Sequence, residues 1–166
     1  MIRRRSRTED DAPRRSAYDR ALEMLARREH SQRELRTRLD RSGYDEADAD
    51  AALARLHDQN YQSDTRFAEM LLRSRIAQGY GPRRIRAELA THGMPAATVQ
   101  ALLAAAATDW LALATAQLRR QFGASGCRIA AERARRAQYL LRRGFDASTV
   151  RSATHAELDE ATDDAD

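Results

Sequence analysis

The sequence contains no lysine, only one cysteine and few aromatic residues. All 29 basic residues are therefore arginines, whose planar guanidinium groups bind phosphate and carboxylate through paired hydrogen bonds. The single cysteine, Cys127, excludes an internal disulfide and suits a reducing compartment such as the cytoplasm. Aromatic residues account for only 5%, and the apolar residues are mostly alanine and leucine with few β-branched ones. This composition favours helix over strand.

Long apolar segments and catalytic motifs are also missing. The longest apolar run, Ala101–Ala107, is far too short to span a bilayer, and no apolar segment follows the basic N-terminus. There is no Walker loop, no GxGxxG and no nucleophile elbow. Four histidines show no metal-ligand spacing and are expected at the surface or at helix caps: His30, His57, His92 and His155. We therefore expect no enzyme, no cofactor, no metal site and no membrane partner.

The net charge of +4 conceals a division along the chain. Residues 1–151 contain all 29 arginines and 19 acidic residues, whereas residues 152–166 contain six acidic residues and no arginine. A basic body indicates a polyanionic partner, and an acidic tail can compete for the same surface.

Helix start and stop signals recur along the chain. Ser31 with Glu34 forms a capping box, Asp45 can cap the next helix, and Pro82 follows a glycine at a helix start. No segment alternates as a strand does. Expected helices cover residues 17–28, 31–43, 45 onward, 63–79, 82–93, 96–107, 109–121, 126–142 and 146–155.

The helix ends reveal a repeat of about 50 residues. The triplet Leu35, Leu39 and Gly43 recurs as Ile85, Leu89 and Gly93, and again as Arg136, Leu140 and Gly144. An apolar residue follows each glycine, as the contact that ends a helix requires. The pattern predicts an all-α protein with three tandem three-helix repeats forming an elongated, curved molecule.

We place the repeats at residues 16–62, 63–107 and 108–155, between a basic segment, 1–15, and an acidic flexible tail, 156–166. Arg136 breaks the apolar pattern of the third repeat. Either that repeat packs differently, or its helix runs longer and leaves Arg136 exposed. An alternative apolar stripe is offered by Ala130, Ala134, Ala137 and Leu141.

Arginine is concentrated in two stretches. Arg73–Leu89 contains five arginines, which fall off the apolar stripe of Ile85 and Leu89, and no acidic residue lies between Arg73 and Arg86. The free N–H groups at the start of the Pro82 helix also favour anions. Residues 119–143 contain eight arginines and one acid. Both stretches suit a polyanion, although each could instead be a solvated face. A solvated face is our interpretation of a third group: Arg33, Arg36, Arg38 and Arg41.

Three motifs are familiar: SxxELRxxLxxxGY from Ser31, DxRFAExxLRSRIxxGYGPxRIRAEL from Asp64, and YLLRRGF from Tyr139. They resemble the RecX family of bacterial regulators of the RecA recombinase, over roughly residues 17–155. The resemblance implies three tandem three-helix repeats and a non-enzymatic inhibitor. Its implied partners are the RecA filament and DNA, single- or double-stranded and without sequence specificity. The alternative is a helix-turn-helix-like DNA-binding protein. Candidate RecA- or DNA-binding residues are Arg73, Arg75, Arg83, Arg84, Arg86, Arg135, Arg136, Arg142 and Arg143.

Overall fold

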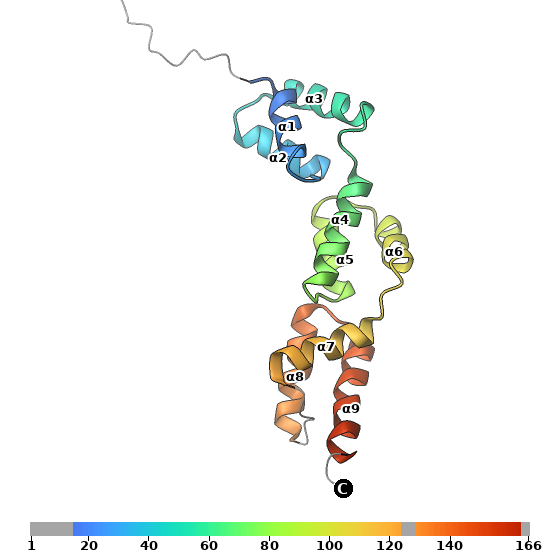
Figure 1. Ribbon diagram of the computed structural model, residues 1–166. Coiled ribbons are helices and arrows are strands. Elements are labelled where there is room, and N and C mark those ends of the chain that lie inside the picture. Colours follow the sequence, from blue (N-terminus) through green and yellow to red (C-terminus); the bar gives the residue numbers. More distant parts are fainter. Residues whose placement is uncertain (1–14, 124–128, 164–166) are drawn as a thin grey trace, which may run out of the picture. The chain divides into compact units, whose positions relative to one another are not determined.

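The computed structural model describes residues 15–123 and 129–163, with side chains placed as far as residue 155. Over these residues the chain forms nine α-helices and no strand, as the composition predicts (Figure 1). The helices divide into two compact units, Met1–Ser63 and Asp64–Asp166. The first unit holds repeat 1, and the second holds repeats 2 and 3.

Repeat 1 consists of α1 (Ala17–Leu25), α2 (Gln32–Arg41) and α3 (Glu46–Asp58). The predicted caps are confirmed, because the Ser31 hydroxyl accepts from the Glu34 N–H at 3.1 Å and the Asp45 carboxylate accepts from the Asp48 N–H at 2.8 Å. The helices enclose an apolar core of small and branched side chains, which includes Ala21, Leu35, Leu39, Leu53 and Leu56.

The second unit contains six helices around two apolar cores. Repeat 2 consists of α4 (Asp64–Ala77), α5 (Pro82–Thr91) and α6 (Ala96–Ala105), and repeat 3 of α7 (Trp110–Phe122), α8 (Ala130–Arg143) and α9 (Ala147–Asp163). Trp110 packs against both cores at the start of repeat 3. The helix that we predicted to start at Gly126 begins at Ala130 instead. Gly126 and Cys127 lie outside the described residues.

The repeat is confirmed in atomic detail at the helix ends. Tyr44, Met94 and Phe145 each donate their N–H to the carbonyl five residues earlier, at 3.2 Å in all three repeats. The glycine before each of them has a positive φ between 79° and 88°, a conformation that glycine adopts without a steric penalty. Local chemistry therefore ends the second helix of each repeat in the same way.

Arg136 takes the core position that leucine and isoleucine occupy in the other repeats. Only 2% of Arg136 is exposed, and its guanidinium lies over the Phe122 ring at 5.2 Å and pairs with Glu132 at 2.8 Å. Our expectations of a rotated stripe or an exposed Arg136 are both wrong, since Ala134 and Leu141 face solvent. The ring and the carboxylate let a cation replace a branched side chain.

Repeat 2 is assembled less tightly than its neighbours. In repeats 1 and 3 the first helix packs along the third, α1 on α3 and α7 on α9, whereas α4 and α6 meet at only a few positions. Helix α6 packs mainly on α5 instead and stands apart from α4 in Figure 1.

Taken singly, each helix in the described part of the chain is too short or too polar to cross a membrane. Helices α6 and α7 pass that test only as a pair, and the pair is bent by 80°. Over the same residues, no group of three His, Cys, Asp or Glu side chains could hold a metal ion.

Candidate functional site

Positive charge is unevenly distributed among the repeats. Residues 16–62 contain eight arginines and ten acidic residues, whereas residues 63–155 contain 15 arginines and six acidic residues. Repeats 2 and 3 therefore carry the excess of basic side chains, and such an excess attracts anionic groups.

The arginines of repeat 1 are largely neutralised. Arg28 and Arg38 pair with Glu34 at 2.6 and 3.1 Å, and Arg36 pairs with Glu46 at 3.4 Å and also with Asp50. The side chains of Arg36 and Arg38 are exposed. For these two residues, the interpretation as a solvated face is confirmed.

Glu34 is the half-buried centre of an ionic network that the sequence did not reveal. Burial by itself raises the pKa of Glu34, but hydrogen bonds and charge from Arg28 and His30 outweigh it and lower the pKa to about 2. His30 was expected at the surface or a cap, yet it is 4% exposed. Its Nδ1 lies 3.1 Å from Glu34, and its carbonyl accepts from Gln62. Burial lowers the pKa of His30, so a neutral imidazole fits this core at pH 7.

The depressed pKa of Glu34 predicts an acid-sensitive first unit. A lowered carboxyl pKa stabilises the fold above the unfolded value of 4.5, and that contribution is lost as the pH falls toward 2. Replacing Glu34 with Gln should therefore cost up to about 3 kcal/mol at pH 7 and much less at pH 3. Urea unfolding of both proteins at the two pH values measures this, with the exposed Glu46→Gln as control. A constant difference between pH 7 and pH 3 would contradict the network.

Repeats 2 and 3 meet where the C-terminus of α8 faces the N-terminus of α5, a contact that we call the joint. The Gly81 N–H donates to the Arg143 carbonyl at 2.8 Å, and the Arg83 N–H donates to the Gly144 carbonyl at 2.9 Å. Pro82 between them has no N–H to offer. The predicted anion site at the start of this helix is therefore wrong, because protein carbonyls already accept those protons.

The joint requires two glycines. A Cβ on Gly81 would lie 2.4 Å from the Gly144 carbonyl group, and a Cβ on Gly144 would lie 2.5 Å from the Cβ of Arg84. Gly144 also has a φ of 88°. The two chain segments can approach this closely only without side chains at these positions.

Four arginines gather around the joint, and we call them the arginine cluster: Arg83, Arg84, Arg142 and Arg143. Arg84 lies over the Tyr80 ring at 4.5 Å, and Arg143 lies 5.0 Å from Tyr80 and 5.3 Å from Tyr139. Arg143 also donates to the Gln78 carbonyl at 2.7 Å. Aromatic rings and a carbonyl orient these guanidinium groups without cancelling their charge.

The arginine cluster keeps its positive charge. Among the described residues, none of its four members forms an ion pair with a carboxylate, and Arg83, Arg84 and Arg142 are exposed. Such groups can bind phosphate or carboxylate without first breaking an internal pair.

The other predicted site residues lie apart from this cluster. Arg75 is held by Glu88 through two hydrogen bonds of 2.7 and 2.5 Å, which raise the pKa of Arg75 and lower that of Glu88. Arg136 lies in the core, as described above. Arg86 reaches Gln100 at 3.5 Å, Arg135 lies 5.9 Å from the Phe122 ring, and Arg73 is 72% exposed with a 3.9 Å contact to Glu69.

Tyr80 and Tyr139 are the participants that sequence reasoning missed. The Tyr80 N–H donates to the Arg75 carbonyl at 3.0 Å and so helps to end α4. Its ring has the further role of supporting two arginines from different repeats. The glycines on both sides of Tyr80 were the available signal, since they permit a close approach by another segment.

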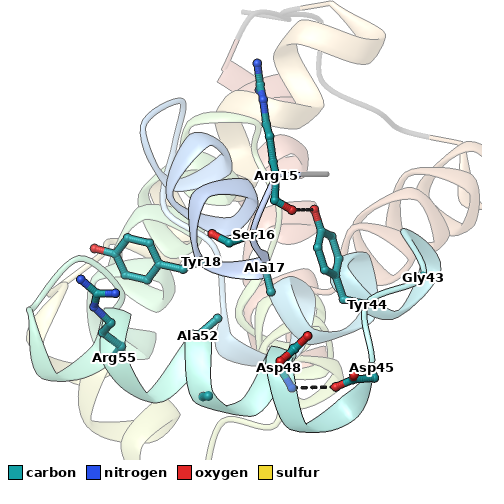
Figure 2. A pocket seen from close by; sticks show the side chains of 11 residues that line it. Arg15, Ser16, Ala17, Tyr18, Gly43, Tyr44, Asp45, Asp48, Ala52 and Arg55 are labelled. Atoms are coloured by element: carbon teal, nitrogen blue, oxygen red, sulfur yellow. Dashed lines mark hydrogen bonds between the residues drawn. The ribbon is translucent and has the colours of Figure 1, made fainter. Parts of the chain in front are cut away.

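A cavity of about 540 Å³ lies in repeat 1 between the start of α1 and the α2–α3 turn (Figure 2). The Tyr44 hydroxyl donates to the Arg15 carbonyl at 2.7 Å, and Asp45 is occupied in capping α3. Arg55 lies over Tyr18 at 4.3 Å. These polar groups are used in contacts within the repeat, so we do not assign a ligand to the cavity.

Comparisons with known proteins agree with this architecture. Residues 17–56, 63–103 and 107–154 match the first, second and third three-helix domains of RecX. "Regulatory protein RecX" of Xanthomonas axonopodis pv. citri is 44% identical over 85% of this chain and 87% of its own length. Its counterpart in Stenotrophomonas maltophilia is 43% identical over 85% and 86%. The crystal structure of RecX from Lactobacillus salivarius superposes with a TM-score of 0.69 at 19% identity, covering 85% of this chain and 94% of that one.

Proposed function

Because the chain belongs to the RecX family of regulatory proteins, we propose that it binds the RecA–DNA filament and blocks filament growth and strand exchange. The observation that carries this proposal is the arginine cluster, where two repeats present guanidinium groups that have no carboxylate partner among the described side chains. We place the activity in the cytoplasm, with no catalysis, cofactor or metal.

The proposed contact is electrostatic and independent of nucleotide sequence. A guanidinium that binds phosphate releases counterions from the nucleic acid, and this release favours binding to either single or double strands. Arg84 and Arg143 are held against tyrosine rings at helix ends, an arrangement that suits phosphate groups better than base edges in a groove. This favours filament regulation over a helix-turn-helix reader of specific sequences.

The inhibition that we propose is steric. A protein lying on the filament through its second unit occupies surface that the next recombinase subunit or the incoming duplex requires. Arg135 and Arg86, which are outside the cluster but basic, add to the same long-range attraction. Arg75 and Arg136 support the fold of this surface from within.

Salt dependence separates the proposed function from plain DNA binding. A plain DNA binder loses affinity steeply as salt rises, whereas protein contacts are weakened less. We expect tighter binding to a RecA-coated single strand than to the same strand naked, with a ratio that grows between about 50 and 200 mM salt. Fluorescence anisotropy at several salt concentrations measures both affinities. If naked DNA competes equally with the filament at every salt concentration, the protein is a DNA-binding protein and not a filament regulator.

A further inference from the structure

An apolar groove opens in repeat 2 at the place where α4 and α6 fail to pack along one another. It has a volume of about 520 Å³ and belongs wholly to the second unit. Leu72 and Ile76 of α4 form one wall, and Leu102 and Ala105 of α6 form the other. Arg73 and Glu69 lie at its rim.

In the other two repeats the first helix packs along the third. Buried alanines on both helices, Ala21 with Ala52 in repeat 1 and Ala114 with Ala153 in repeat 3, allow the first and third helices to pack closely. In repeat 2 α4 also carries a buried alanine, Ala68, but α6 presents the larger Leu102 where α3 and α9 have alanine. The groove therefore lies between α4 and α6 of repeat 2. Ile76, Leu102 and Ala105 keep part of its walls accessible to a partner, whereas Leu72 is buried.

We propose that this groove holds an apolar side chain of the recombinase protein, with an adjacent carboxylate of the same partner pairing with Arg73. The inference rests on the proposed function and divides its contacts: the arginine cluster binds phosphate, and the groove binds protein. Leucine-sized anchors in such pockets supply much of the affinity of protein interfaces.

Charge and chemistry select this occupant. Nucleic acid presents phosphates and sugars, which gain little from walls of leucine, isoleucine and alanine. An acidic protein surface is complementary to residues 63–155, where arginines outnumber acids by 15 to six. The Arg73 side chain is 72% exposed and its contact with Glu69 is long, at 3.9 Å, so it is available to a carboxylate that approaches the groove.

The test fills the groove without changing charge. Ala105→Gln with Ala106→Gln puts two longer side chains into it, and Ala101→Gln with Ala104→Gln is the matched control on exposed positions of the same helix outside the groove. We expect the groove variant to bind a RecA-coated strand about tenfold more weakly while binding naked DNA normally, and the control to match the native protein. Arg73→Gln should weaken filament binding more than Arg151→Gln, although both remove one positive charge.

Each outcome of this experiment decides a separate question. If native protein shows no preference for the filament, the proposed function itself fails. If that preference exists and the groove variant retains it, the groove assignment alone is overturned. If the groove variant loses as much affinity for naked DNA as for the filament, the groove binds nucleic acid. If the native protein sediments as a dimer and the groove variant as a monomer, the groove binds a second copy of this chain.

Discussion

Replacing Arg83, Arg84 and Arg142 together with glutamate is expected to abolish inhibition of RecA strand exchange and weaken filament binding by roughly a hundredfold or more. The three side chains are exposed, belong to the cluster at the joint and have no carboxylate partner in the described structure. Reversal thus replaces attraction to phosphate by repulsion and leaves the buried Ile85 and Leu89 untouched. Circular dichroism should show unchanged helix content.

A matched charge reversal in repeat 1 shows whether the loss of binding comes from the arginine cluster itself or from the change in net charge. Arg27, Arg33 and Arg41 are exposed, and their replacement by glutamate changes the total charge by the same amount. We expect this control to lower affinity only slightly, because its sites lie in a repeat with more acids than arginines. Normal inhibition by the cluster variant, or an equal loss in both variants, would remove the arginine cluster from the interface.

The second large effect is expected at Gly144. Gly144→Ala places a side chain on a backbone with a φ of 88° and puts its Cβ 2.5 Å from the Cβ of Arg84. The cost of the backbone conformation and the cost of the steric overlap therefore add. The left-handed backbone costs roughly 1–2 kcal/mol, and overpacking against a fixed backbone adds about 1–3 kcal/mol. The free energy of unfolding should therefore fall by about 2–5 kcal/mol, with binding to the filament falling as the joint opens.

Gly93 supplies the control for this prediction. Its φ is 83°, but a Cβ there would meet nothing within 4 Å. Gly93→Ala should lose only the backbone term of roughly 1–2 kcal/mol. Urea unfolding followed by circular dichroism compares the two variants. Equal losses would mean that the backbones of α5 and α8 do not approach each other as closely as described.

The features that could be predicted from the sequence are those that depend on neighbouring residues. Local sequence determines the helix caps at Ser31 and Asp45 and the glycines that end the helices. The regular spacing of these signals made the repeat recognisable. Ile85 and Leu89 were correctly assigned to the core because a helix places them on one face.

The features that escaped prediction depend on partners far along the chain. Arg75 seemed short of acids because none lies between Arg73 and Arg86, yet the fold brings Glu88 to it across the α4–α5 turn. Arg136 is tolerated in the core only because Phe122 from another helix covers it. The arginine cluster was predicted as two separate basic stretches, and the backbone contact at the joint turns them into one surface.

The joint also sets an order of events during synthesis of the protein. The N–H groups of Gly81 and Arg83 leave the ribosome roughly sixty residues before the carbonyls of Arg143 and Gly144 that accept their protons. At typical elongation rates of about 5–20 residues per second, helix α5 waits several seconds for its acceptors. The corresponding delay in repeat 1 is shorter, because Gln62, which donates to the His30 carbonyl, follows His30 by 32 residues. Repeat 1 can therefore complete its hydrogen bonds before the joint between repeats 2 and 3 forms.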